Sequence, residues 1–255
     1  QLGVSEADLL AAHVGEGVRR IEPRVNELLQ GLKAVGEVMA LTRNESAVHE
    51  KIGVYDRVFT GERAALVLGP DIDLRIFPKA WAHGFAVEKR DGEAVRRSLQ
   101  FFDQAGEAVH KVHLRPASDV AAYENLVETL ISPDQGQTIE TRPVGKTSFD
   151  DAEAGSVDEL RERWSAMTDV HQFFGMLNAL KLSRRQAVGM VGEDYAWPLD
   201  GEALTAMFNL SAQEEIPIMC FVGNHGCIQI HSGPVSNIKP MGPWINVLDE
   251  TFHLH

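Results

Sequence analysis

The chain has 255 residues, of which 44% are hydrophobic and 24% charged, as in an ordinary globular protein. Its formal net charge of −13 argues against nucleic acid as a partner, because phosphate binding needs clustered Lys and Arg. No apolar run reaches the roughly 18 residues of a membrane-spanning helix. The first residues also lack the basic and apolar regions of a signal peptide. We expect one large domain or two, and the two cysteines, which form no disulfide framework, favour the cytoplasm.

The first predicted elements are helices within residues 5–33. Ser5 is a suitable N-cap, and Asp8 stands where a capping box places its second acceptor. The negative net charge opposes the use of these helices to bind DNA. Residues 37–115 are expected to form strands. Apolar and polar side chains alternate from Ile72 to Phe77, which is the period of a strand with two different faces.

Residues 133–157 are poor in large apolar side chains and rich in Asp, Glu, Gly, Pro, Ser and Thr, so they are the best candidate for a linker. We expect a first domain over residues 1–132 and a second over residues 158–255. The second half is predicted to contain helices over 157–180, 183–192 and 199–214, followed by strands from residue 216.

A faint internal repeat relates the two halves. A shift of residues 38–54 by 180 positions pairs Met39 with Met219, Asn44 with Asn224 and Gly53 with Gly233. The shared order of strand-like blocks indicates a duplication. The first copy continues into a predicted hairpin around Gly106, whereas the second copy stops at His255. We therefore expect the second repeat to be incomplete, with an unpaired sheet edge that favours association, for example as a homodimer.

His171 lies in the most informative predicted helix. Apolar side chains spaced three or four residues apart place it on one apolar face, with Leu160, Trp164, Met167, Phe174 and Leu177. Such a histidine is either a core residue bonded to a backbone carbonyl or an axial ligand of haem iron, since a porphyrin needs apolar walls and a nitrogen donor. A zinc site would need further ligands, and none lies three or four residues away.

Two groups of arginines are further candidates. Arg184 and Arg185 follow a predicted N-cap, where guanidinium groups suit carboxylates such as haem propionates, or are simply solvated. Arg75 lies on a strand among apolar residues, where it could orient a water or polarise dioxygen. The alternative is an exposed Arg75 that pairs with Asp73, two residues away.

Other features limit the chemistry. The sequence has no GxSxG, GxxxxGK[ST], GxGxxG or HExxH motif, so hydrolase, P-loop, dinucleotide and zinc-protease functions lack support. Cys220 and Cys227 are expected to be buried thiols in a reducing compartment. His253 and His255 share one face of a predicted strand.

Six segments together carry a resemblance to a known family. They are residues 41–50, 73–77, 101–106, 163–174 (RWSAMTDVHQFF), 221–231 and 244–248. In this order they closely resemble the cytoplasmic haemin-degrading and haem-trafficking proteins of the HemS/ChuS type, across essentially the whole chain. The resemblance implies an α+β fold built as a tandem repeat of antiparallel sheets with flanking helices.

The resemblance also implies a haem site in a cleft between a second-half helix and the first-half sheet. The proximal iron ligand of the family falls on His171, and its distal arginine, which acts through a water, falls on Arg75. A propionate-binding arginine falls on Arg184 and a distal-wall phenylalanine on Phe221. A first-half histidine with a less certain role falls on His49. A family lysine that meets a propionate has no counterpart before residue 255.

Two functions follow from the resemblance. The first is oxidative degradation of haem with release of iron, in which Arg75 and His171 are the catalytic residues and an external electron donor is required. The alternative is a haem-trafficking chaperone that takes haem from an inner-membrane importer and delivers it to a separate haem oxygenase. Both functions use the same ligand set, so the sequence does not choose between them.

Overall fold

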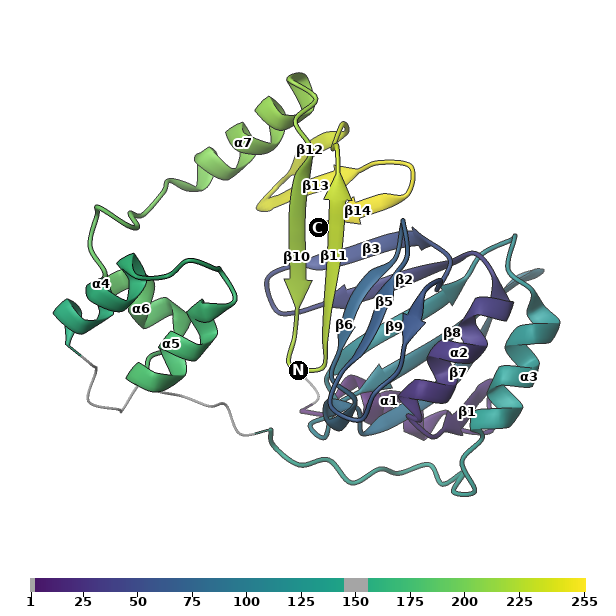
Figure 1. Ribbon diagram of the computed structural model, residues 1–255. Helices are drawn as coiled ribbons and strands as arrows, with labels where there is room; N and C mark the ends of the chain where they lie inside the picture. Colours follow the sequence, from purple (N-terminus) through teal and green to yellow (C-terminus); the bar gives the residue numbers. More distant parts are fainter. Residues whose placement is uncertain (1–2, 145–155) are drawn as a thin grey trace. The chain divides into compact units, whose positions relative to one another are not determined.

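The structure is a computed structural model that describes residues 3–144 and 156–255 (Figure 1). The chain forms two compact units, a larger one from residues up to 144 and from 205 onward, and a smaller one that ends at Leu204. Helices and antiparallel sheets confirm the predicted α+β class. Among the described residues, no helix is both long and apolar enough to cross a membrane. The predicted linker lies partly outside the described residues, so the division into domains at residues 133–157 stays a prediction.

The larger unit contains a nine-stranded antiparallel sheet. Its strands are β1 (Val18–Ile21), β2 (Val38–Arg43), β3 (Val48–Gly53), β7 (His83–Asp91), β8 (Ala94–Phe102), β9 (Ala108–Leu114), β12 (Ile238–Met241), β13 (Trp244–Leu248) and β14 (Phe252–Leu254). They are arranged in the order β1-β7-β8-β9-β2-β3-β14-β13-β12. The predicted hairpin is formed by β8 and β9, and Gly106 in its turn has a φ of 78°. Gly106 is required because a Cβ there would collide with the Ser5 side chain.

A second, five-stranded sheet belongs to the same unit. Its strands are β4 (Val58–Phe59), β5 (Ala65–Leu68), β6 (Asp73–Ile76), β10 (Ile218–Gly223) and β11 (Cys227–Gly233), in the order β10-β11-β6-β5-β4. The hairpin β2-β3 adds to β14, whereas its counterpart 180 residues later, β10-β11, adds to β6. Each sheet therefore combines strands from both halves of the sequence. The two hairpins that the repeat relates each add to a strand from the other half, β3 to β14 and β11 to β6.

Asn44 and Asn224, which the shift of 180 residues pairs, link the two hairpins reciprocally. The Asn44 side-chain amide donates to the Gly223 carbonyl at 2.9 Å, and the Asn224 amide donates to the Arg43 carbonyl at 3.0 Å. The side-chain oxygen of each asparagine also accepts two backbone N–H groups of its own turn. This arrangement is the structural counterpart of the repeat seen in the sequence.

Helices cover the larger unit. The helix α1 (Glu6–Ala12) begins at Ser5, whose capping box with Asp8 is present as predicted. The next helix is α2 (Val25–Val35), and the strand β1 lies between the two, so the region 5–33 is not helical throughout. Gly15 and Gly17 adopt positive φ angles there, which allow the turn that brings β1 alongside β7.

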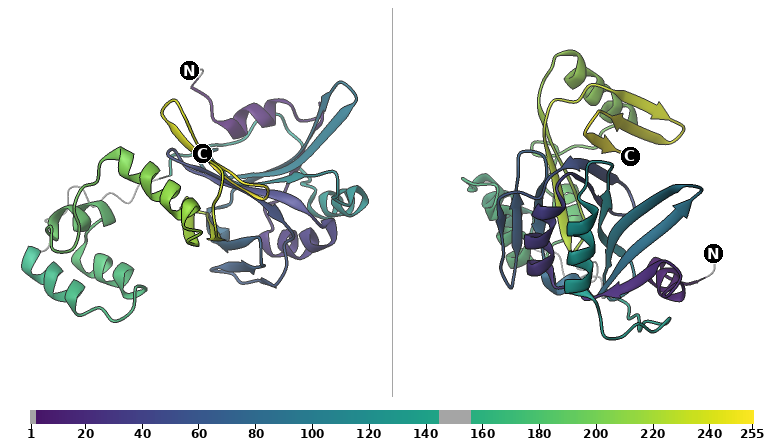
Figure 2. Two further views of the ribbon diagram at one scale, coloured as in Figure 1. Left: turned by 90° about the horizontal axis from the view of Figure 1, so that it is seen from above. Right: turned by 90° about the vertical axis from the view of Figure 1, so that its right-hand side faces the viewer.

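The helix α3 (Val120–Leu130) lies beside α2 on the nine-stranded sheet (Figure 2). Gly31 permits this close packing, since a Cβ at that position would lie 2.5 Å from a Leu126 methyl carbon. The apolar faces of both helices share one core with side chains from both sheets, including Leu28, Leu32, Val38, Leu74, Leu99, Val112 and Leu130.

The smaller unit is helical. It contains α4 (Val157–Ser165), α5 (Gln172–Leu180) and α6 (Arg184–Met190), and α7 (Gly201–Gln213) begins in it and continues into the larger unit. The predicted helices over 183–192 and 199–214 are confirmed. Its core consists of Leu160, Met176, Leu177, Leu180, Leu182, Ala187 and Val191.

Replacement of Asn224 by Ala should lower the free energy of unfolding by about 3 kcal/mol. The variant leaves the carbonyls of Arg43 and of Val109 on β9, and two backbone N–H groups of the β10-β11 turn, without their side-chain partner. Urea denaturation measures the change. The control is Asn209→Ala on the exposed side of α7, which should leave stability nearly unchanged. Equal stabilities of the two variants would contradict a structural role for the Asn44–Asn224 link.

Candidate functional site

The predicted helix over residues 157–180 is broken, and the break determines where His171 lies. The helix α4 ends at Ser165, α5 begins at Gln172, and His171 is the N-cap residue of α5. Within the break, the Asp169 carboxylate accepts the backbone N–H of His171 at 2.8 Å. Side-chain acceptors of this kind compete with the hydrogen bonds of a continuous helix. The prediction that His171 lies in the middle of an apolar helix face is therefore wrong.

The side chain of His171 projects into solvent rather than into the core. It is 90% exposed, so the alternative of a buried core histidine is also wrong. Its Nδ1 lies 2.6 Å from Asp169 Oδ1. Because a carboxylate accepts, Nδ1 is the donor in this contact, which leaves Nε2 as the ring nitrogen that can bind a ligand. The backbone and ring hydrogen bonds from His171 lower the pKa of Asp169, which stays ionised.

The carboxylate–imidazole pair of Asp169 and His171 is the arrangement in which proteins present a histidine to a metal. The outer hydrogen bond fixes the tautomer and the orientation of the ring, and the other nitrogen binds the ion. Apolar side chains beside His171 are unusually exposed: Val170 is 81% and Phe174 59% accessible. A Cβ at Gly175 would meet no atom beyond its own part of the helix within 4 Å, so the space beside this turn of α5 is open.

Arg184 lies at the same end of the smaller unit as Phe174. It is the first residue of α6, after the N-cap Ser183, as predicted. Its guanidinium carbon lies 5.1 Å from the centre of the Phe174 ring, within the range of a cation–π contact. The guanidinium is therefore placed beside an exposed aromatic ring, where it can bind an acidic group of a ligand that covers the ring.

Arg75 lies on β6 in the larger unit. Its guanidinium donates to the Asp73 carboxylate and, at 3.2 Å, to the Leu74 carbonyl. The pairing with Asp73 that the sequence offered as an alternative is thus present. The side chain remains about one-third exposed, so the pairing orients the guanidinium without burying it.

Arg75 and Phe221 share the outer face of the five-stranded sheet. Residues opposite each other in neighbouring strands point to the same side, and the register links Phe221 through β11 to Asp73 in one row. Phe221 is 57% exposed. Apart from Ser232, the remaining strand side chains of this face are apolar: Phe59, Leu66, Leu68, Met219, Ile228 and Ile230. Arg75 is therefore a cation on an apolar surface, which suits a ligand with both a large apolar body and a polar centre.

The predicted site residues are divided between the two units. His171 and Arg184 belong to the smaller unit, and Arg75 and Phe221 to the larger. Each pair lies on a surface that combines exposed apolar side chains with a cation. Sequence reasoning missed the part played by Asp169. The available signal was an acidic residue two positions before the histidine, the spacing at which Asp side chains accept backbone N–H groups at turns.

His49 is buried in the larger unit. Neither of its ring nitrogens has a hydrogen-bond partner among the described residues, and its ring packs edge-on against Phe252 at 4.9 Å. Burial lowers its pKa to about 3. His110 is also buried and has a pKa of about 3, and its ring contacts the hydroxyl groups of Tyr55 at 2.6 Å and Thr42 at 2.9 Å. Both imidazoles are therefore neutral parts of the core.

The two cysteines are free thiols and form no disulfide with each other. Cys227 is fully buried, as expected, whereas Cys220 is only partly buried. Burial raises the pKa of Cys227 to about 12, so it is an unreactive thiol at neutral pH.

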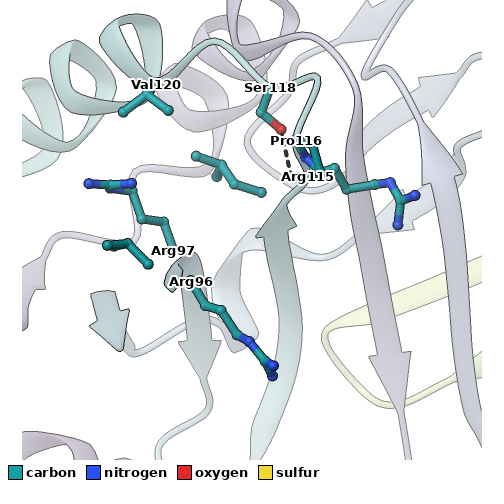
Figure 3. A pocket seen from close by; sticks show the side chains of 8 residues that line it. Arg96, Arg97, Arg115, Pro116, Ser118 and Val120 are labelled. Atoms are coloured by element: carbon teal, nitrogen blue, oxygen red, sulfur yellow. Dashed lines mark hydrogen bonds between the residues drawn. The ribbon is translucent and has the colours of Figure 1, made fainter. Parts of the chain in front are cut away.

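A surface cavity of about 330 Å³ in the larger unit is lined by three arginines, but it does not form an anion site. Arg96, Arg97 and Arg115 point away from one another (Figure 3). Each is paired with a carboxylate: Arg97 with Glu88 at 3.0 Å, Arg115 with Glu37 at 3.4 Å, and Arg96 with Asp91 at 3.5 Å. Because the three guanidinium groups diverge and each already has a carboxylate partner, they do not converge on one anion in this cavity.

Comparison with known proteins relates the chain to proteins named for haem. A family model described as the haemin-degrading HemS.ChuX domain matches residues 3–130 and 181–255. The hemin transport protein HmuS of Yersinia pestis is 39% identical, over 100% of this chain and 73% of its own. Holo-PhuS, a heme-binding protein from Pseudomonas aeruginosa, has a TM-score of 0.95 and 42% identity, over 100% of this chain and 74% of its own. ChuS, described as an E. coli heme oxygenase, has a TM-score of 0.88 and 35% identity, over 100% of this chain and 76% of its own. The chain therefore belongs to the family of haemin-degrading HemS/ChuX domains.

Proposed function

We propose that this chain binds haem in the bacterial cytoplasm, with His171 as the axial ligand of the iron. The observation that carries the proposal is the exposed imidazole whose Nδ1 is held by Asp169 and whose Nε2 is left to bind. Val170 and Phe174 supply apolar surface for the porphyrin. The names of two relatives, the heme-binding protein PhuS and the hemin transport protein HmuS, support haem as the bound molecule.

Three further residues complete the proposed site. Arg184, beside Phe174, binds a haem propionate through its guanidinium. Arg75, whose guanidinium is oriented by Asp73, would position a water and stabilise negative charge as it develops on bound haem. Phe221 contributes an apolar wall beside Arg75.

The main proposed activity is oxidative degradation of haem with release of iron. Bound haem supplies the redox chemistry of its own cleavage, which consumes dioxygen and electrons from an external donor. The protein holds the iron through His171, orients the ring through Arg184 and Phe221, and provides a fixed cation through Arg75. The description of the relative ChuS as a heme oxygenase supports this activity.

The alternative is haem trafficking, from an inner-membrane importer to a separate haem oxygenase. It is favoured by the accessibility of His171, since a ligand that is 90% exposed can be exchanged for that of an acceptor protein. The name of HmuS as a hemin transport protein agrees with it.

Turnover in the presence of catalase distinguishes the two functions. Haem-loaded protein is incubated with ascorbate in air and under nitrogen, while the Soret band and chelatable ferrous iron are measured. Degradation predicts loss of the band and release of iron in air, even when catalase removes free peroxide. If catalase abolishes all product while haem still passes intact to a purified haem oxygenase, trafficking is correct instead.

Replacement of Asp169 by Ala should weaken haem binding by about 10- to 100-fold, because the ring of His171 loses the hydrogen bond that fixes its tautomer and orientation. Asp169→Asn keeps a neutral acceptor, so its haem affinity should lie between those of Asp169→Ala and the wild type. The measurement is a Soret titration, with the exposed Glu162→Ala on α4 as the control. If Asp169→Ala and Glu162→Ala bind haem equally well, Asp169 does not position the ligand.

A further inference from the structure

The nine-stranded sheet carries a second group of metal-ligating side chains, far in sequence from the residues assigned to haem. We propose that Glu50, His253 and His255 bind a divalent first-row transition-metal ion. One donor atom from each of the three side chains lies within 4.8 Å of the others. This proposal does not depend on the proposed haem function, since none of its residues belongs to the haem site.

The register of two neighbouring strands places the three side chains on one face. His253 on β14 is directly opposite Glu50 on β3. His255 follows two residues later and forms both backbone hydrogen bonds with Val48, at 2.8 and 2.9 Å. Because side chains alternate along a strand, His253 and His255 point to the same side as Glu50. The cluster is therefore a consequence of strand pairing rather than of a flexible loop.

The separation of the first two donors matches that of ligands on one metal ion. His253 Nδ1 lies 3.1 Å from Glu50 Oε2. Tetrahedral coordination with bonds of about 2.0–2.1 Å puts neighbouring ligand atoms about 3.3 Å apart. An ion pair alone would explain this contact, but it would not explain the third donor, His255, or the way in which that ring is held.

His255 is fixed in the tautomer that a metal ligand requires. Its Nδ1 lies 2.7 Å from the side-chain oxygen of Asn246 on β13. The orientation of the Asn246 amide is not arbitrary, since its nitrogen donates to the Lys239 carbonyl at 3.1 Å. The oxygen therefore faces His255, Nδ1 carries the proton, and Nε2 keeps its lone pair. Asn246 is itself 5% exposed, so the support is rigid.

The accessibility and charge of the cluster also suit a bound ion. The side chains of Glu50 and His253 are 21% and 34% exposed, so they are ordered by the sheet but open to solvent. Two neutral imidazoles and one carboxylate are a ligand set used for zinc and for non-haem ferrous iron, with a remaining position open to water. Zn²⁺ and Co²⁺ are suitable probes for an ion of this class.

The test is a titration of the purified protein with Zn²⁺, in competition with a chromophoric chelator, and with Co²⁺, whose visible bands report its coordination. We expect one Zn²⁺ per chain and Co²⁺ bands of a four- or five-coordinate site. Glu50→Gln and His253→Asn should each weaken binding by at least about 100-fold, and Asn246→Leu by about tenfold. His171→Ala and the exposed His13→Ala are controls that should bind as the wild type does.

Two outcomes would overturn the proposal: wild-type protein that does not bind Zn²⁺, or Glu50→Gln and His253→Asn variants that bind it as tightly as the controls. Circular dichroism without metal checks that each variant is folded. A thermal melt gives an independent readout, because Zn²⁺ should raise the melting temperature of the wild type and of His171→Ala but not that of either ligand variant. Haem affinity should be unchanged in both ligand variants.

Discussion

Replacement of His171 by Ala should weaken haem binding by at least about 100-fold, a loss of about 3 kcal/mol or more. The imidazole is the one strong nitrogen donor that the surface of α5 presents, and Asp169 holds it in the tautomer that leaves Nε2 to bind. The apolar contacts of Val170 and Phe174 remain in the variant, so weak binding should persist without the spectrum of a histidine-ligated iron. A Soret titration measures both the affinity and the spectrum.

The matched control for His171 is His13→Ala, since His13 is also an exposed histidine that pairs with a nearby carboxylate, Glu16, at 3.4 Å. It should bind haem as the wild type does. If the His171→Ala and His13→Ala variants have the same affinity and the same Soret maximum, the exposure of His171 has no bearing on haem, and another ligand must be sought.

Acidification should destabilise the larger unit steeply, because two of its histidines are buried in the neutral form. The pKa values of His49 and His110 are lowered from 6.5 to about 3 by burial. Above pH 6.5 both histidines are neutral in the folded and unfolded states, so they do not affect stability. As the pH falls from 6.5 towards 3, only the unfolded chain binds protons, and each histidine removes about 1.4 kcal/mol per pH unit. At pH 5 the two together should cost about 4 kcal/mol.

Urea denaturation between pH 8 and pH 5 tests this acid effect. His49→Leu removes one of the two titrating groups and also a buried ring without hydrogen bonds, so it should be at least as stable as the wild type at pH 7.5 and less sensitive to acid by about 1.4 kcal/mol per pH unit. Asn209→Ala, on the exposed side of α7, removes no titrating group and should keep the wild-type slope. A pH dependence that is the same in His49→Leu and in the wild type would contradict the buried neutral state of His49.

Local signals predicted much of the secondary structure. Ser5 and Ser183 cap helices because each is followed three residues later by a side chain that can complete a capping box. The turn at Gly106 follows from a glycine between two apolar runs. The pair Asn44 and Asn224 was visible as a repeat, although its reciprocal hydrogen bonds were not.

The elements that sequence reasoning missed depend on distant partners. The strand β1 is short, and it exists because β7 pairs with it more than sixty residues later. The exchange of strands between the halves, in which β14 pairs with β3 and β11 with β6, has no local signal at all. Periodicity alone also favoured one helix over residues 157–180, because it does not register that Asp169 satisfies a backbone N–H at the break.

The candidate site shows the same limit. Periodicity placed His171 on an apolar helix face, and only the family resemblance marked it as a ligand. In the structure His171 is exposed at a break in the helix, where Asp169, two residues earlier, accepts its backbone N–H. For Arg75, the short spacing to Asp73 on one strand was sufficient to predict the pairing. The assignment of His171, Arg75, Arg184 and Phe221 to one haem stays a prediction.

The central claim is that the imidazole of His171 is bonded to haem iron, and resonance Raman spectroscopy of the ferrous complex tests it most directly. The wild type should show an iron–histidine stretching band that shifts when histidine is labelled with ¹⁵N. The band should be absent in His171→Gly and return when free imidazole is added, since the glycine leaves space for it beside Asp169. An iron–histidine band that persists unchanged in His171→Gly without imidazole would contradict the claim.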